Sequence, residues 1–442
     1  MQPASLRKTV PICDNGGGGS KRLEAKSLLH CLKRDNPNIE KSVLSSIHTV
    51  SLDMVSRLQE QKERSDTMAN RDWIQVFKLL HENPELGFQE TATTSKIGEI
   101  LEEEGIEIVP TDLSTGLIAM IRGNREGRAV CLRADIDALP ICEQTGLDYA
   151  SRNNGAMHAC GHDFHITVAL AAAAKLNGLK DHLNGTVYFA FQPAEEIFGG
   201  AEKVLQTGIL RNVSEFYGFH ADPALKVGEV GIKEDGVMAS VDRFRINVKG
   251  TGTHAATPHL GNNPITVLTS LISALQNFAV REIPPSQSYV VSFTHIDGGN
   301  TWNIIPETAF CEGTVRTFRD KDRRFIRDSF FRIVHGFTEM TGTECILEWI
   351  SGPPAVINSG PLCEAARISA AETGFKAIDF VPEMISDDFS FYTENNPNAQ
   401  GLYLKIGTGV GYPLHHPKFK IDLEAIGPGA ELISRILKNA LS

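Results

Sequence analysis

The chain has 442 residues, of which 41% are hydrophobic and 22% are charged, so it can bury a large core and hold two folded domains. Its formal net charge of −11 argues against nucleic acid or an anionic membrane as a partner, because both bind basic surfaces. No apolar run is long enough to cross a bilayer, and we expect no secretory signal because the first residues lack an apolar segment. The eight cysteines show no paired spacing, which fits reduced thiols and a cytoplasmic location.

Residues 1–65 differ from the rest of the chain. A glycine run at 16–19 lies among polar and basic segments, and apolar residues then recur at three- and four-residue steps over 41–64. We predict an N-terminal extension that is partly disordered and contains one accessory helix.

From residue 66 onward, apolar strands and helices alternate. Short strands are predicted at 128–133, 185–191 and 215–219, and an alanine-rich buried helix at 165–176. Polar groups follow the carboxyl end of each strand, which is typical of an open, mostly parallel α/β sheet. We assign this pattern to a catalytic domain formed by residues 66–238 and 353–442.

Residues 239–352 interrupt that pattern. The sequence predicts a half-exposed strand around residues 244–248, a helix over 264–280, strands at 289–296 and 309–318, a helix over 322–341 and a strand at 344–350. This βαββαβ order forms a complete α+β unit with one helical face, so we predict an inserted satellite domain.

The most informative short segment is HACGHD at residues 158–163. Cys160 and His162 supply a thiol and an imidazole two positions apart, and Gly161 between them allows a tight turn. Both side chains could hold one divalent cation. A buried cysteine next to a helix-capping Asp163 is an equally good interpretation of this segment alone.

Further candidate ligands follow two other predicted strands. Glu195 and Glu196 come directly after the strand at 185–191, His220 ends the next strand, and His415 lies near the C-terminus. Paired carboxylates suit metal-assisted hydrolysis, because one can bind the cation while the other transfers a proton. Taken singly, the glutamate pair could be a solvated surface pair and His220 a structural histidine.

Six segments together resemble the M20 family of metal-dependent amidohydrolases and peptidases. The resemblance is strongest to the branch of N-acyl-amino-acid amidohydrolases, hippurate hydrolases and auxin-conjugate hydrolases, and it extends over residues 70–430. The segments are HENPELG at 81–87, LRADIDALP at 132–140, HACGHD at 158–163, FQPAEE at 191–196, GTHAATP at 252–258 and GTVRTF at 313–318.

The resemblance implies a zinc-peptidase type of catalytic domain and a role for each matching residue. Glu195 matches the general base, Asp137 an acidic residue that supports the site, and His254 a histidine that helps to hold the substrate carbonyl oxygen and can come from a partner subunit. Asn303 and Arg316 are suited to binding a substrate carboxylate. The implied metal ligands are Cys160, His162, Glu196, His220 and His415.

The function that follows is hydrolysis of the amide bond of N-acyl amino acids or amino-acid conjugates by a metal-activated water, as in an aminoacylase. We expect one or two divalent cations (zinc, manganese, cobalt or nickel) and a homodimer formed through the satellite domain. A dipeptidase or aminopeptidase of the same fold, a cysteine hydrolase with Cys160 as nucleophile, and a non-catalytic binding protein remain as alternatives.

The chain departs from the family pattern at two places. Family members often carry Glu-Asp-Phe late in the chain, where this sequence has Asp387-Asp388-Phe389. Ile197 and Phe198 replace the small residues that are common after the glutamate pair, and we expect them to narrow the pocket.

Overall fold

The computed structural model describes residues 71–396, 398–409 and 411–441. The predicted N-terminal extension with its accessory helix lies outside the described residues, as do the first five residues of the predicted catalytic domain.

The larger sheet has eight strands in the order β1-β2-β4-β3-β5-β16-β6-β15. Strand β3 is parallel to β4 and β5, β5 to β16, and β6 to β15, whereas the other three pairs are antiparallel. The predicted mostly parallel α/β sheet is therefore confirmed. The strands are β1 Glu107–Val109, β2 Leu117–Arg122, β3 Arg125–Asp135, β4 Asn184–Gln192, β5 Val213–Asp222, β6 Glu229–Gly231, β15 Lys376–Ile378 and β16 Gln400–Gly407.

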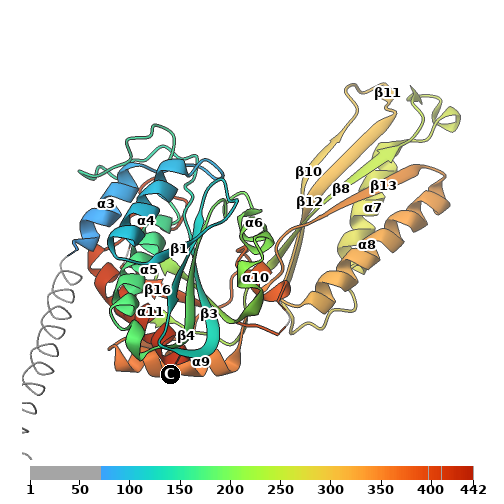
Figure 1. Ribbon diagram of the computed structural model, residues 1–442. Helices are drawn as coiled ribbons and strands as arrows, with labels where there is room; N and C mark the ends of the chain where they lie inside the picture. Colours follow the sequence, from blue (N-terminus) through green and yellow to red (C-terminus); the bar gives the residue numbers. More distant parts are fainter. Residues whose placement is uncertain (1–70, 397, 410, 442) are drawn as a thin grey trace, which may run out of the picture. The chain divides into compact units, whose positions relative to one another are not determined.

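Helices cover both faces of this sheet (Figure 1). Helix α5 (His162–Asn177) is buried on nearly every side, which explains its alanine-rich sequence, because small side chains let the sheet and outer helices approach closely. The other helices on this face are α3 Trp73–Glu82, α4 Thr91–Glu103, α9 Gly360–Glu372 and α11 Ile426–Ala440, and the opposite face carries α6 Gly200–Gln206 and α10 Ser390–Glu394.

A second sheet contains four strands in the order β10-β12-β8-β13, and α7 and α8 pack on one face of it (Figure 1). Along the chain the order is β8-α7-β10-β12-α8-β13, which confirms the predicted βαββαβ unit. The elements are β8 Ser240–Lys249, α7 Pro264–Phe278, β10 Tyr289–Gly298, β12 Thr308–Thr317, α8 Asp320–Thr341 and β13 Glu344–Ser351. The sequence did not predict the short ribbon of β9 (Thr253–His254) and β11 (Ile304–Ile305).

The second sheet is an insertion, because strands of the larger sheet precede and follow it along the chain. A small pair, β7 (Asp235–Met238) and β14 (Val356–Asn358), joins the two connecting segments. On this topology we propose a catalytic domain of residues 66–238 and 353–442 and a satellite domain of residues 239–352. Across the described ranges, no helix has the length and apolar character needed to cross a membrane.

Candidate metal centre

The carboxyl ends of neighbouring strands bring the predicted site residues together. Asp135 at the end of β3 pairs with Gln192 at the end of β4, so the segments that follow leave the sheet side by side. The backbone N–H of Glu196 donates a hydrogen bond of 3.0 Å to Asp137 Oδ2. Asp137 thus contacts the turn that carries the glutamate pair, and its supporting role stays a prediction.

Gly161 makes the cysteine turn possible. It has a left-handed φ of 83° at the start of α5, and a Cβ atom there would lie 3.0 Å from Ala221 Cβ. A residue with a side chain would be strained and crowded at this position. The turn places Cys160 and His162 beside the end of β5, where His220 precedes Ala221.

The five predicted metal ligands converge. Cys160 Sγ lies 3.3 Å from His220 Nε2 and 3.2 Å from His415 Nε2. Glu196 Oε1 lies 3.4 Å from His415 Nε2 and 3.9 Å from His162 Nε2. Donor atoms from four separate parts of the chain therefore meet at the carboxyl edge of the sheet.

The backbone of His415 has an uncommon conformation that lets its side chain reach Cys160 and Glu196. Its φ is 63°, a left-handed value that costs a non-glycine residue roughly 1–2 kcal/mol. Its N–H donates a hydrogen bond of 2.8 Å to the carbonyl of Ala159, which ties the C-terminal loop to the cysteine turn. Strain of this kind is common where a side chain must be aimed at a ligand.

Two buried atoms in this cluster have no hydrogen-bond partner. His162 Nε2 and Glu196 Oε1 are both enclosed and unsatisfied, although buried polar atoms in native proteins are nearly always paired. A cation between them would satisfy both. The residues present therefore fit a bound divalent cation.

The histidines are oriented as ligands. His162 Nδ1 lies 2.8 Å from the carbonyl of Asp137, and His220 Nδ1 lies 2.7 Å from the carbonyl of Ala221. A protonated Nδ1 donates to each carbonyl, and in the neutral ring Nε2 then keeps its lone pair. Burial opposes the charged ring of His162, but Asp135 and Asp137 raise its pKa to about 10, so a cation at its Nε2 would have to displace a proton. Burial followed by the nearby His165 lowers the pKa of His220 well below its usual range, which favours the neutral ring.

Cys160 belongs to two possible ligand groups. Cys160, His162 and His220 form one, and Cys160, Glu196 and His415 form the other, with the donor atoms of each group within 4.8 Å of one another. A shared thiolate with imidazole and carboxylate donors suits one well-held cation or two adjacent ones.

The environment of Cys160 argues against a cysteine nucleophile. Burial, and then the charges of Glu196 and Glu195, raise the pKa of the Cys160 thiol well above its ordinary value. A nucleophilic cysteine needs the opposite shift. A neighbouring cation would stabilise the thiolate, so the metal-ligand interpretation is physically more favourable.

Glu195 lies among other carboxylates. It is buried, and its oxygen lies within 4.8 Å of carboxylate oxygens of Asp387 and Asp388, the segment to which the sequence assigned no role. A carboxylate oxygen of Glu195 also lies within 4.8 Å of a ring nitrogen of His162 and of a carboxylate oxygen of Glu196. Burial and then the two aspartates raise the pKa of Glu195 well above its ordinary value.

A buried network centred on Arg133 was not predicted from the sequence. This side chain is only 1% exposed and donates to Asp135 at 2.6 Å, Gln192 at 2.9 Å and Asp388 at 2.7 Å. Asp135 in turn pairs with His165. The signal was Arg133 directly after the apolar residues 129–132, because a charge at the end of a buried strand requires partners.

Two of the three predicted residues of the satellite domain, His254 and Asn303, are neighbours, whereas Arg316 lies on another strand. His254 is exposed on β9, and its neighbour Ala255 donates a hydrogen bond of 3.0 Å to the carbonyl of Asn303. Arg316 lies on β12 and donates to Ser386, next to Asp387, at 3.3 Å. Among the described residues, no hydrogen bond or ion pair joins His254 or Asn303 to the cysteine turn.

His81 belongs to the segment HENPELG at 81–87 and contacts the residue that follows the predicted ligand His162. Its Nδ1 lies 2.6 Å from Asp163, the residue after His162, and its Nε2 lies 3.3 Å from Glu143. Burial opposes the charged imidazolium, but the hydrogen bonds to these two carboxylates outweigh it and raise the pKa of His81 to about 9.

This raised pKa predicts a pH-dependent stability. The contribution of His81 is fully present below the unfolded pKa of 6.5 and is lost as the pH rises through about 9. The shift corresponds to about 3 kcal/mol in the free energy of unfolding. Urea denaturation should show that the free energy of unfolding of the natural chain falls between pH 6 and pH 9.5. For His81→Gln, the free energy of unfolding should fall much less over the same range. Equal losses in both proteins would contradict the assignment.

Comparison with known proteins gives a consistent result. The sequence profile of Peptidase family M20/M25/M40 matches residues 131–439. The N-acetylcysteine deacetylase of Bacillus subtilis is 43% identical, covering 82% of this chain and 95% of the relative. The thermostable carboxypeptidase 2 of Saccharolobus solfataricus is 33% identical, covering 84% of this chain and 96% of that protein.

A solved structure from Bacillus subtilis, described as a dinuclear metal-binding peptidase of the M20 family, superimposes with a TM-score of 0.75 at 40% identity. It covers 84% of this chain and 97% of its own. The profile match spans more than half of the chain, and the relatives match over nearly their whole length. With its metal-ligand geometry and its inserted α+β unit, the chain therefore belongs to Peptidase family M20/M25/M40.

Proposed function

We propose that this chain hydrolyses the amide bond of N-acyl amino acids, releasing a carboxylic acid and a free amino acid. The observation that carries the proposal is the convergence of one thiol, three imidazoles and one carboxylate beside the buried Glu195. The similarity to an N-acetylcysteine deacetylase supports the choice of an N-acyl amino acid as substrate.

The residues that would hold divalent cations are Cys160, His162, Glu196, His220 and His415. Because Cys160 belongs to two ligand groups, two cations are favoured over one. The thiolate suits zinc, while manganese, cobalt and nickel remain candidates. A cation bound there would polarise the acyl carbonyl and lower the pKa of a water molecule to roughly 7.

Glu195 is our proposed general base and acid. It would take the proton from the attacking water and deliver it to the nitrogen of the leaving amino acid. A carboxylate that is buried beside Asp387 and Asp388 binds a proton more readily than a solvated one, which suits a group that must carry a proton between two steps.

Arg316 is our proposed partner for the substrate carboxylate. Its guanidinium is half-buried on β12, and desolvation lowers its pKa, so an anion brought next to it would be favoured. We expect Arg316→Ala to raise KM for an N-acyl amino acid by roughly 10- to 100-fold, and to leave KM for the matching amino-acid amide nearly unchanged. Arg243→Ala, an exposed arginine on the neighbouring β8, is the control. If Arg316→Ala raised KM equally for the N-acyl amino acid and for its amide, this role would be refuted.

His254 and Asn303 are proposed to serve the carbonyl oxygen and the carboxylate of a substrate in a homodimer. Strand β10 is a ten-residue edge strand with exposed positions, and Trp302 beside Asn303 is 91% exposed. An open edge strand of this kind can pair with a second copy. Light scattering coupled to gel filtration should give twice the chain mass.

We also propose a cytoplasmic location, because all six cysteines in the described ranges are free thiols. Fractionation of the natural host tests this, and recovery outside the cytoplasm would refute it.

A kinetic panel tests the proposed function. Protein stripped of metal and reconstituted with each candidate cation should hydrolyse N-acetyl amino acids and lose activity on chelation. Dipeptides with a free amino group should be poor substrates. Preference for dipeptides would instead favour the second candidate, a peptidase, which the similarity to a carboxypeptidase makes the natural alternative. Activity that survives chelation would refute both.

A further inference from the structure

Three large apolar side chains are exposed next to the glutamate pair. Ile197 and Phe198 directly follow Glu196 and are 61% and 37% exposed, and Phe88 is 40% exposed. We call Phe88, Ile197 and Phe198 the apolar rim. Exposed apolar residues that gather beside a catalytic carboxylate usually mark a ligand-contacting surface rather than a defect of folding.

The rim is one continuous surface, because its two segments interlock. A Cβ atom on Gly87 would lie only 3.0 Å from Ile197 Cγ1, and one on Gly199 would lie 3.6 Å from Phe88 Cζ. Because both positions are glycine, the Ile197 side chain can lie against Gly87 and the Phe88 ring can lie against Gly199. The two segments that carry the rim are therefore packed against each other.

Two of these residues have a strained backbone. Phe88 and Phe198 have φ values of 59° and 61°, a left-handed conformation that bulky residues rarely adopt. The Phe198 N–H donates a hydrogen bond of 3.0 Å to the carbonyl of Glu195, so the strained turn is coupled to the proposed base. Two aromatic rings held in this way beside a catalytic group point to a function for the rings.

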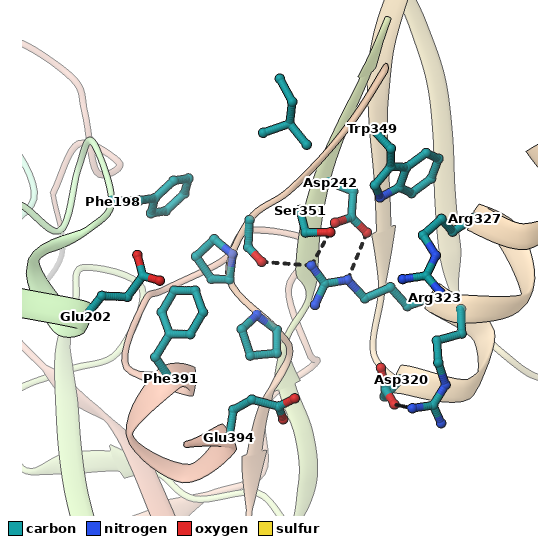
Figure 2. A pocket seen from close by; sticks show the side chains of 15 residues that line it. Phe198, Glu202, Asp242, Asp320, Arg323, Arg327, Trp349, Ser351, Phe391 and Glu394 are labelled. Atoms are coloured by element: carbon teal, nitrogen blue, oxygen red, sulfur yellow. Dashed lines mark hydrogen bonds and ion pairs between the residues drawn. The ribbon is translucent and has the colours of Figure 1, made fainter. Parts of the chain in front are cut away.

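The rim also borders a cavity. Of the three rim residues, only Phe198 lines a cavity of about 590 Å³, whose wall carries Phe391 and Trp349 beside charged side chains such as Glu202 and Arg323 (Figure 2). Its volume is typical of sites for small organic molecules. The cavity gives space for a ring or a branched chain next to Phe198.

The geometry of the substrate indicates which part would reach the rim. This step rests on the proposed function. If Arg316 on the satellite domain binds the α-carboxylate, the amino-acid side chain, attached to the same Cα, lies near the satellite domain too. The acyl group is on the opposite side of the scissile carbonyl and so faces the catalytic domain, which carries the whole rim.

We propose that the apolar rim binds the acyl group, and that this chain prefers N-acyl amino acids with an aromatic or branched acyl group over N-acetyl amino acids. The acetyl group is too small to cover the three side chains, whereas a phenylacetyl group buries apolar surface against them.

The test compares kcat/KM for the N-phenylacetyl and N-acetyl derivatives of one amino acid. The natural chain, reconstituted with its best cation, should favour phenylacetyl by about 10-fold or more. Phe198→Gly removes the ring and relieves the left-handed strain, so it should fold, and Ile197→Ala shortens a partly exposed side chain. Each should lower the phenylacetyl-to-acetyl ratio by roughly 5- to 10-fold. Leu179→Ala is the matched control, because this 38% exposed residue follows the opposite end of α5 from His162.

Each outcome has a distinct meaning. A lowered ratio in both rim variants and an unchanged ratio in Leu179→Ala would support the proposal. An unchanged ratio in the rim variants, or a natural chain that favours acetyl, would overturn it while leaving amide hydrolysis intact. If the variants instead alter the preference among amino acids at a fixed acyl group, the rim binds the amino-acid side chain and the proposal is wrong. Absence of hydrolysis of every N-acyl amino acid would overturn the proposed function as well.

Discussion

Replacing Glu195 with glutamine is expected to lower kcat by about 10³-fold while metal content stays unchanged. The amide has nearly the same shape as the carboxylate but cannot accept a proton from water, so proton transfer fails at both steps. Glu195 is not among the five proposed ligands, and its burial beside Asp387 and Asp388 favours the proposed role as a proton carrier. Steady-state kinetics and elemental analysis of the same preparation give the two readouts.

The control for this variant is Glu102→Gln, a glutamate exposed on α4 that has no contact with the metal centre. It should retain full activity. A Glu195→Gln protein that keeps a rate within a few-fold of the natural chain would show that another group transfers the proton. Loss of bound metal in this variant would instead make Glu195 a ligand.

Replacing Cys160 with alanine is expected to remove most of the bound metal and nearly all activity. The sulfur lies within 3.3 Å of both His220 and His415 and is the one atom shared by the two ligand groups. Its loss leaves each group with two donors, which hold a divalent cation weakly. Metal content by mass spectrometry and the rate with excess cation measure the effect.

Two further substitutions sharpen this test. Cys160→Asp keeps an anionic ligand at the position and should recover part of the metal content, with weaker preference for zinc because oxygen is a harder donor. Cys142→Ala changes an exposed cysteine and should alter neither metal content nor rate. Full metal content in Cys160→Ala would contradict the proposed site.

The strands and helices that the sequence predicted lie close to those of the structure, because their hydrophobic periods are clear, but β1, β2, β6, β15 and β16 of the larger sheet were not predicted. The strand at 289–296 and the helix at 322–341 differ from β10 and α8 by two residues at one end only. The alanine-rich segment at 165–176 begins three residues late, because His162 and Asp163 look like loop residues although they form the first turn of α5. Polar residues with a role at the site obscure the start of a helix.

The polar contacts beneath the site could not be predicted. Nothing in the sequence places Asp388 beside Arg133, since 255 residues separate them. Likewise, the contact of His81 with Asp163 joins α3 to the first turn of α5. Such pairs depend on the folded arrangement of the helices around the sheet, which hydrophobic periodicity does not specify.

Residue chemistry identified the candidate ligands, but the family resemblance was needed to propose a role for each of them. Each residue alone had an ordinary structural explanation, and the spacing between Cys160 and His415 carries no local signal. The structure adds the distances and the unsatisfied atoms of His162 and Glu196, which no sequence pattern reveals.

We propose above all that Cys160 binds a divalent cation together with the surrounding imidazoles. X-ray absorption at the zinc edge of the zinc-reconstituted protein tests it most directly. We predict one sulfur neighbour at about 2.3 Å among nitrogen and oxygen neighbours at about 2.0–2.2 Å, and loss of that sulfur in Cys160→Ser. A spectrum of the natural chain that contains only nitrogen and oxygen neighbours would contradict the account.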